Sequence, residues 1–174
     1  MRRQSFLLFR IYRFQDTKAY AELYDLYYTR IRRFVFFKVP EGPEVDEVTA
    51  EVFLRGWEYM TSSRVDHAGA LFYRIARNLI ADYYRKRQEE ISTDQIVELP
   101  DRVDLASDVA DKEEAQALIL LLRELKEEYR EILHMRYLDE MSVKEISQIL
   151  EKTPNHVRVN LHRARQALKA IANE

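Results

Sequence analysis

The chain contains no cysteine, which excludes disulfide bonds, thiol catalysis and thiolate metal sites. Glycine and proline are scarce, with three and four residues among 174. No apolar run approaches the roughly 20 residues that a membrane-spanning helix needs, and the run at 6–9 is too short for the core of a signal peptide. We therefore expect a soluble, cytoplasmic chain without membrane insertion.

Long segments with helical periodicity lie between these few breakers, and 47% hydrophobic residues suffice for a core. The pattern predicts helices over 17–39, 45–60 and 70–88. Residues 1–14 could form an amphipathic first helix or a partly ordered tail, and we favour the tail. Further helices are expected from Lys112 and over 127–138. The sequence thus predicts an all-α protein with two small helical domains, 1–88 and 112–174, joined by a flexible linker over 89–111.

The net charge of -2 hides a strong segregation of charge along the chain. Residues 89–114 hold ten acids against Arg102 and Lys112, whereas residues 152–169 hold five cations and no acid. This distribution predicts basic surfaces on both domains and an acidic linker between them. The linker could fold back and mask the basic surfaces, or it could be a solvated tether.

The segment 141–171 predicts a helix-turn-helix. Ser142 followed by Glu145 is a capping box, which starts a first helix. Thr153 can cap a second helix whose first residue is Pro154. The second helix has one apolar stripe, formed by Val157, Leu161, Ala164 and Leu168.

The other faces of this second helix are polar and basic, as in a recognition helix that enters a major groove. A merely solvated helix would be expected to mix both signs of charge, and this one does not. The candidate DNA-contacting residues are Asn155, His156, Arg158, Val159, Asn160, His162, Arg163 and Arg165.

Two helices of the first half carry further candidate sites. The helix over 45–60 directs Val48, Val52, Phe53 and Trp57 inward and is acidic outside. The helix over 70–88 interleaves rings, including Phe72 and Tyr73, with cations, a combination that suits single-stranded nucleic acid but also fits a solvated helix end. Its candidate contacts are Arg74, Arg77, Asn78, Tyr83, Tyr84, Arg85 and Arg87.

Three motifs resemble those of bacterial RNA polymerase sigma factors, in the extracytoplasmic-function (ECF) group of the sigma-70 family. Residues 70–87 (ALFYRIARNLIADYYRKR) resemble the promoter-melting helix, and residues 46–57 (DEVTAEVFLRGW) resemble the polymerase-binding helix. Residues 129–138 (YREILHMRYL), 141–147 (MSVKEIS) and 161–165 (LHRAR) resemble the promoter-reading domain. Their order and spacing make the resemblance more specific than any single motif.

The resemblance implies a factor that binds core RNA polymerase, directs it to promoters and assists DNA melting, with an anti-sigma factor as a further partner. The residues implied to bind polymerase are Asp46, Glu47, Glu51, Phe53 and Trp57. The helix over 70–88 is implied to hold the melted non-template strand at the minus-ten element, with Asn78 beside an extruded base. The recognition helix is implied to read duplex DNA at the minus-thirty-five element through Arg158, His162, Arg163 and Val159, with His156, Asn160 and Arg165 nearer phosphates.

One departure concerns the turn of the helix-turn-helix. Glu151 stands where the family usually has glycine, so the turn must reach its geometry another way or accept strain.

Two other functional classes compete with this interpretation. A stand-alone helix-turn-helix regulator would use the C-terminal domain but leaves the acidic helix and the ring-rich basic helix without a role. An enzyme is disfavoured, because the four histidines lack metal-ligand spacing and no phosphate loop or nucleophile motif is present. We expect no catalytic residue, metal or cofactor.

Overall fold

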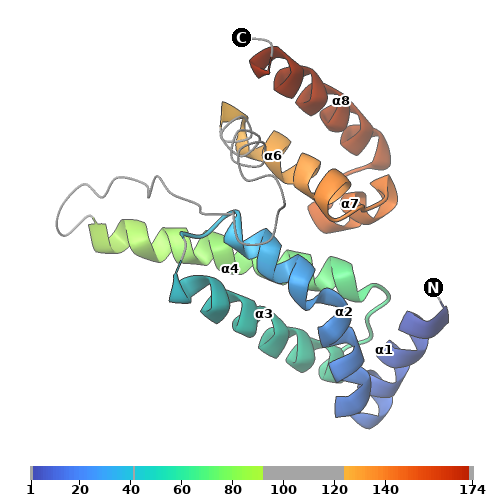
Figure 1. The fold of residues 1–174 in the computed structure, drawn as a ribbon. Helices are drawn as coiled ribbons and strands as arrows, with labels where there is room; N and C mark the ends of the chain where they lie inside the picture. Colours follow the sequence, from blue (N-terminus) through green and yellow to red (C-terminus); the bar gives the residue numbers. More distant parts are fainter. Residues whose placement is uncertain (1, 41, 92–123, 173–174) are drawn as a thin grey trace, which may run out of the picture. The chain divides into compact units, whose positions relative to one another are not determined.

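The computed structural model describes residues 2–40, 42–91 and 124–172, and these contain helices and connecting turns but no strand. The chain divides into two compact units, Met1–Arg102 and Val103–Glu174 (Figure 1). Most of the predicted linker over 89–111, and the predicted helix from Lys112, lie outside the described residues. The exact domain boundaries therefore remain a prediction, whereas the all-helical prediction is confirmed.

The first unit contains four described helices, α1 (Arg2–Phe14), α2 (Thr17–Phe36), α3 (Pro43–Ser62) and α4 (Ala68–Ile91). Helices α2, α3 and α4 pack against one another, and α1 packs on α2 and α3 (Figure 1). Helix α4 begins two residues before and ends three residues beyond the predicted 70–88. None of the described helices is long and apolar enough to cross a membrane.

The prediction of a partly ordered tail over 1–14 is wrong, because these residues form helix α1. Leu7, Leu8 and Ile11 share one face of it and are buried. Within α1, Arg10 donates to Oδ2 of Asp16, which lies just beyond the helix, through Nε at 2.9 Å and Nη2 at 2.6 Å. The alternation of apolar residues and arginines predicted a segment with little regular structure. Burial of three aliphatic side chains against the rest of the unit stabilises a helix instead.

The sequence offers Asp16 or Thr17 as the N-cap of α2, and the structure shows that Asp16 caps it. Its Oδ1 accepts from the backbone N–H of Lys18 at 2.9 Å and of Ala19 at 3.0 Å. The Ala19 hydrogen bond, together with the Arg10 guanidinium, lowers the pKa of Asp16. The same carboxylate thus starts α2 and anchors α1 to it.

Aromatic rings fill the core of the first unit. Phe72 lies against Phe53 and Tyr27, with ring centroids 4.9 and 5.5 Å apart. Gly56 allows α3 to approach this cluster, because a Cβ built there would lie 2.4 Å from Cε1 of Phe72. Tyr20 donates its hydroxyl hydrogen to the carbonyl of Phe53, and burial raises the pKa of Tyr20.

The second unit contains α6 (Glu127–Leu133), a π-helical turn η1 (His134–Leu138), α7 (Val143–Leu150) and α8 (Pro154–Ile171). The sequence predicted one helix over 127–138, whereas the structure widens its second half into η1. His134 and Asp139 are both buried here, with Nε2 and Oδ2 3.1 Å apart. His134 is therefore a core residue of this unit.

The predicted caps of the helix-turn-helix are both present. The hydroxyl of Ser142 accepts from the N–H of Glu145, and Glu145 in turn accepts from the N–H of Ser142 at 2.9 Å. Thr153 Oγ1 accepts from the N–H of His156 at 3.2 Å, with Pro154 as the first helical residue. Because three residues connect α7 to α8, the two helices are held in a short, defined turn.

Glu151 ends α7 in the left-handed conformation, with φ 55° and ψ 39°. A residue with a Cβ pays about 1 kcal/mol in this region, a cost that glycine avoids. The chain has therefore kept the geometry that glycine favours and accepts the strain.

Replacing Glu151 with glycine should raise the free energy of unfolding of the second unit by about 1 kcal/mol, because the left-handed residue would no longer carry a Cβ. Urea unfolding followed by circular dichroism measures it. Glu151→Ala is the matched control, since it removes the same carboxylate but keeps the Cβ. A glycine variant no more stable than the alanine variant would contradict the expectation.

Candidate nucleic-acid and partner interfaces

The outer face of α3 carries the carboxylates predicted to contact a protein partner. Asp46 and Glu47 are exposed, and Glu51 is half-buried. Arg32 Nε donates to Asp46 Oδ1 at 2.8 Å, and Arg55 Nε donates to Glu51 Oε1 at 2.6 Å. Glu47 has no ion pair within the part of the chain that the structure describes. A cation on a partner could therefore meet Glu47 without displacing an arginine.

Phe53, predicted as a polymerase-contacting residue, requires a correction. Its side chain is only 4% exposed and packs against Tyr24 and Phe72, with ring centroids 4.6 and 4.9 Å away. It supports the acidic face from within and cannot present its ring to a partner. Trp57 is half-buried against Tyr20, at a centroid distance of 5.1 Å, so part of its ring remains available.

One face of α4 gathers four of the predicted nucleic-acid contacts. With 3.6 residues per turn, Arg74, Arg77, Asn78 and Arg85 fall on one side of the helix. Arg74, Asn78 and Arg85 are exposed and Arg77 is half-buried. Arg85 Nη2 also lies 2.9 Å from Asp82 Oδ1, an exposed pair that holds its guanidinium only weakly.

The two tyrosines of α4 differ in their place around the helix, because Tyr83 lies away from this basic face and Tyr84 lies at its edge, two turns beyond Arg77. Tyr83 is half a turn from Arg74 and accepts a hydrogen bond from Arg87 Nη1 at 2.7 Å. Tyr84 donates its hydroxyl hydrogen to the carbonyl of Lys38 at 2.5 Å, which ties α4 to the end of α2. Both rings are half-buried. The helix therefore separates Tyr83 and Arg87 from the other predicted strand contacts, whereas Tyr84 stays beside Arg77 with its hydroxyl engaged by Lys38.

Phe72 and Tyr73, which the sequence placed among rings that could stack on bases, are core residues instead. Both are fully buried, and Tyr73 meets Phe34 edge to face at 5.0 Å. The correction follows from packing, because the buried surface of α4 is wide enough to include Leu71, Phe72, Tyr73 and Ala76.

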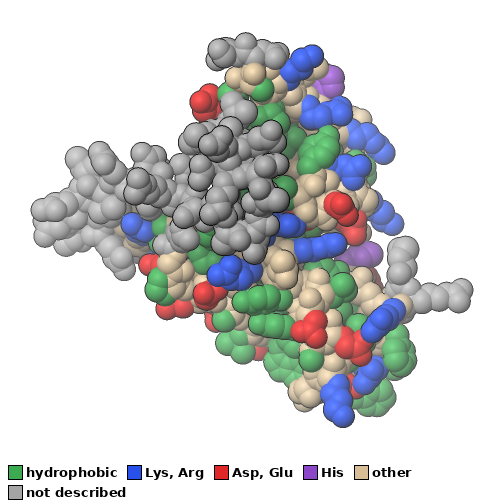
Figure 2. All heavy atoms as spheres, in the orientation of Figure 1, with side chains coloured by type: hydrophobic (Ala, Val, Ile, Leu, Met, Phe, Trp, Pro, Cys, Tyr) green, Lys and Arg blue, Asp and Glu red, His purple; other side chains and the backbone are tan. Residues whose placement is uncertain are grey.

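Helix α8 has the predicted division into an inner and an outer face. Val157, Leu161 and Ala164 are buried and Leu168 is half-buried, so the predicted stripe is confirmed as the inner face. Figure 2 shows Lys, Arg and His side chains gathered along the outer side of this helix. The exposed residues among the predicted contacts are Asn155, His156, Arg158, Val159, His162, Arg163 and Arg165, and Asn160 is half-buried.

The residues opposite the inner stripe form a line along α8. Asn155, Val159, His162 and Gln166 recur at four, three and four residues, half a turn from Val157 and its neighbours. Gln166 is not among the contacts predicted from the sequence. Its position could have been found from the sequence, because Gln166 lies half a turn from the inner stripe and in line with Val159 and His162.

The cations of α8 flank this central line on both sides. Arg158 and Arg165 lie toward one side of it, and Arg163 lies toward the other. Asn160 Nδ2 and His156 Nε2 are 3.1 Å apart on the side of Arg163. A central polar line between two cationic flanks suits a helix in a groove whose two walls are phosphates.

Family models match both units. The model for sigma-70 region 2 matches residues 23–90, and the model for sigma-70, region 4 matches residues 115–168. Together they cover the acidic face of α3, the basic face of α4 and nearly all of α8.

Related proteins extend along most of the chain. The ECF RNA polymerase sigma factor SigM of Bacillus subtilis is 28% identical over 87% of this chain and 94% of its own length. The ECF RNA polymerase sigma factor SigW of the same organism is also 28% identical, over 88% of this chain and 89% of its own.

Solved structures share the fold. CnrH, in complex with the cytosolic domain of CnrY, has a TM-score of 0.73 at 20% identity and covers 98% of this chain and 97% of its own. The sigma factor RpoE of Bartonella quintana, in complex with the anti-sigma factor NepR, has a TM-score of 0.69 at 16% identity, over 90% and 98%. With both regions matched in order, the chain belongs to the ECF group of the sigma-70 family and directs RNA polymerase to promoters.

Proposed function

We propose that α3 binds core RNA polymerase, that α4 holds the melted non-template strand of the minus-ten element, and that α8 reads the minus-thirty-five element. The chemistry of transcription belongs to the polymerase, and this chain supplies no catalytic group. The division into domains over 1–88 and 112–174, with an acidic tether over 89–111, is part of the proposal.

The observation that carries the proposal is that separate helices carry surfaces of opposite charge. Helix α3 presents Asp46, Glu47 and Glu51, whereas the outer faces of α4 and α8 present arginines. Nucleic acid repels the first surface and attracts the other two. A protein that bound duplex DNA alone would need only the last of them.

For the melted strand, the supporting geometry is the cluster of Arg74, Arg77 and Asn78. Two guanidiniums can contact successive phosphates while the amide of Asn78 pairs with the edge of an extruded base. Tyr83 and Tyr84 take secondary roles in this proposal. Tyr84 fixes α4 to α2, and Tyr83 orients Arg87.

For the duplex element, the central line of α8 faces the bases. Asn155, Val159 and His162 would contact base edges, and Gln166 would extend this line. Arg158, Arg163 and Arg165 would contact the phosphates on the two groove walls. This arrangement revises the expectation that Arg158 and Arg163 read bases directly.

An anti-sigma factor and a cytoplasmic location complete the proposal. RpoE, which has a similar fold, forms a complex with the anti-sigma factor NepR. We propose that a protein of this kind controls the present chain. Core RNA polymerase and promoter DNA are cytoplasmic in bacteria, so a factor that joins them acts there.

Charge reversal of Asp46 and Glu47 to lysine tests the polymerase surface. Like charges across an interface cost several kcal/mol, so co-elution with core polymerase and run-off transcription should both fall by at least about tenfold. Shift of a promoter duplex by the free chain should not change, because the substitutions lie outside α8.

Asp46→Asn with Glu47→Gln is the matched control, because it removes charge without adding repulsion and should retain more transcription. Loss of the Arg32 ion pair costs at most about 1 kcal/mol, which thermal unfolding of each variant will reveal. Undiminished transcription by the lysine variant would contradict the proposal and favour a stand-alone DNA-binding regulator.

A further inference from the structure

Helix α1 has a second, exposed face that the proposed function does not use. Its inner face, Leu7, Leu8 and Ile11, is buried in the first unit. On the outside, Phe6, Phe9 and Phe14 are 59%, 56% and 67% exposed. Scattered exposed apolar residues are ordinary, but three phenylalanines within nine residues of one helix form a patch that needs an explanation. We refer to these three residues as the aromatic ridge.

Arginine side chains accompany the aromatic ridge. The guanidinium of Arg10 lies 5.7 Å from the ring centroid of Phe6, within cation–π distance. Arg13 follows Phe9 by one turn on the same side of the helix. Helix α1 contains no acidic residue. Figure 2 shows hydrophobic and basic side chains adjoining at the end of the unit where α1 lies.

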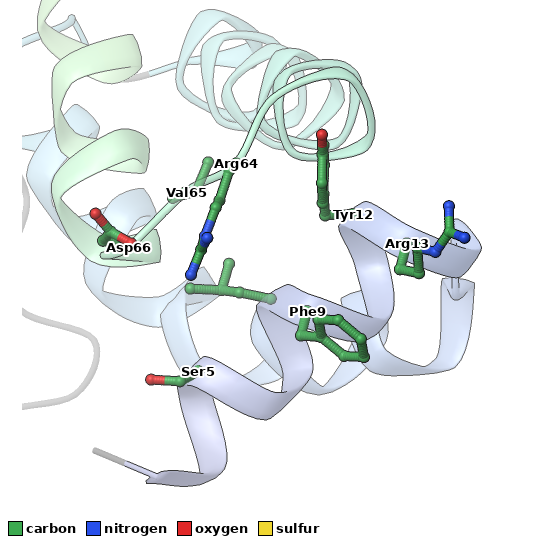
Figure 3. Close-up of a pocket in the computed structure, with 8 residues that line it drawn as sticks. Ser5, Phe9, Tyr12, Arg13, Arg64, Val65 and Asp66 are labelled. Carbon is green, nitrogen blue, oxygen red and sulfur yellow. The ribbon is translucent and has the colours of Figure 1, made fainter.

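A hollow of about 350 Å³ lies beside the aromatic ridge, and a further cation, Arg64, lines it. Phe9, Tyr12 and Arg13 of α1 line it together with Arg64 and Asp66 of the loop before α4. Figure 3 shows Arg64 extending from this loop toward α1, while Arg13 points away from the loop. Arg13 and Arg64 have no ion pair within the described residues, so both can face an external anion.

Ring orientation separates the two anionic partners that aromatic and cationic side chains commonly meet. Successive bases of a single strand need ring faces on which to stack. The rings of Phe9 and Phe14 meet edge to face at 86°, with centroids 6.0 Å apart, and Arg10 covers one face of Phe6. Insertion among lipid acyl chains and headgroups does not depend on parallel faces. It requires protruding rings with cations at headgroup level.

We propose that the aromatic ridge of α1, with Arg13 and Arg64, attaches this protein to an anionic lipid surface. The rings enter the interface between headgroups and acyl chains, and the two guanidiniums contact lipid phosphates. Each cation near an anionic surface strengthens attachment about fivefold. Because only three rings insert, the attachment is reversible.

Sedimentation of the full chain with vesicles tests the proposal. Vesicles of equal parts phosphatidylglycerol and phosphatidylcholine should bind the chain, and vesicles of phosphatidylcholine alone should bind it much more weakly. Phe6→Ser with Phe9→Ser should lower the partition coefficient about 30-fold, because two inserted rings are lost. Arg13→Glu changes the charge by two, so it should lower the partition coefficient about 25-fold and weaken its dependence on salt.

Leu26→Ser with Leu54→Ser is the matched control, because it removes two other exposed apolar side chains, and its partition should stay within about twofold of the parent. Circular dichroism should confirm that every variant is folded. Equal binding to both kinds of vesicle, or unchanged binding of the Phe6, Phe9 variant, would overturn the proposal. It would also fail if that variant lost affinity for a single-stranded oligonucleotide while its vesicle binding stayed intact.

Discussion

Replacing both Arg158 and Arg163 with alanine is expected to weaken binding to a promoter duplex about 100-fold, or by about 3 kcal/mol. The two guanidiniums lie on opposite flanks of α8, so the proposed geometry assigns one to each phosphate wall of the groove. Removing two phosphate contacts should also reduce the slope of log affinity against log salt by about 2. Fluorescence anisotropy of a labelled duplex at several salt concentrations measures both quantities.

The control is His162→Ala, in the middle of the same outer face. This substitution should weaken binding less and should change which base is preferred at one position, because a base contact carries the sequence information. The arginine variant should lose affinity equally for matched and mismatched duplexes. A change in base preference on loss of Arg158 and Arg163 would show instead that they read bases.

A Gly56→Ala variant is expected to lose about 2 kcal/mol of stability in the first unit. The new methyl group would lie 2.4 Å from Cε1 of Phe72 and 3.1 Å from the hydroxyl of Tyr20, so a buried ring must move. Overpacking of this kind costs about 1–3 kcal/mol, which exceeds the gain of up to about 1 kcal/mol that alanine brings within a helix. Urea unfolding followed by circular dichroism measures the difference.

Combining Gly56→Ala with Phe72→Leu provides the control, because the smaller side chain leaves room for the methyl group. The combined variant should be less destabilised than the sum of the two single changes, by about 1 kcal/mol. Glu58→Ala on the exposed side of α3 should stay within about 0.5 kcal/mol of the parent. Strict additivity at Gly56 and Phe72 would contradict the role assigned to Gly56.

Local sequence signals predicted the helix-turn-helix best. Ser142, Glu145, Thr153 and Pro154 act on their own backbone within three residues, so their effect is visible without tertiary structure. The same holds for Asp16 at the start of α2. Helix existence was predictable from the scarcity of glycine and proline, whereas helix ends shifted by up to three residues because packing decides where the last turn stops.

Tertiary packing determines which aromatic rings are buried, and the sequence alone did not show this. Phe53 stands among acidic neighbours, and Phe72 and Tyr73 stand near arginines, yet all three are core residues. Composition alone cannot distinguish a ring that packs from a ring that stacks on a base. Helical phase distinguishes Phe72, which lies nearly half a turn from Arg74. It does not distinguish Tyr73, which precedes Arg77 by one turn and is shown to be a core residue only by its packing against Phe34. Residues 2–14 form a helix for the same reason, because the helices that stabilise it, α2 and α3, lie elsewhere in the sequence.

The left-handed corners at Gln15, Glu140 and Glu151 bear on how long the protein persists in a cell. Each keeps a Cβ where glycine would be relaxed, at a cost of about 1 kcal/mol. Two of the three lie in the second unit, which raises its unfolded population about 30-fold over a glycine equivalent. Proteases degrade such open forms in proportion to that population. We therefore expect the two corners of the second unit to make it more open to proteolysis than a variant with glycine at both positions.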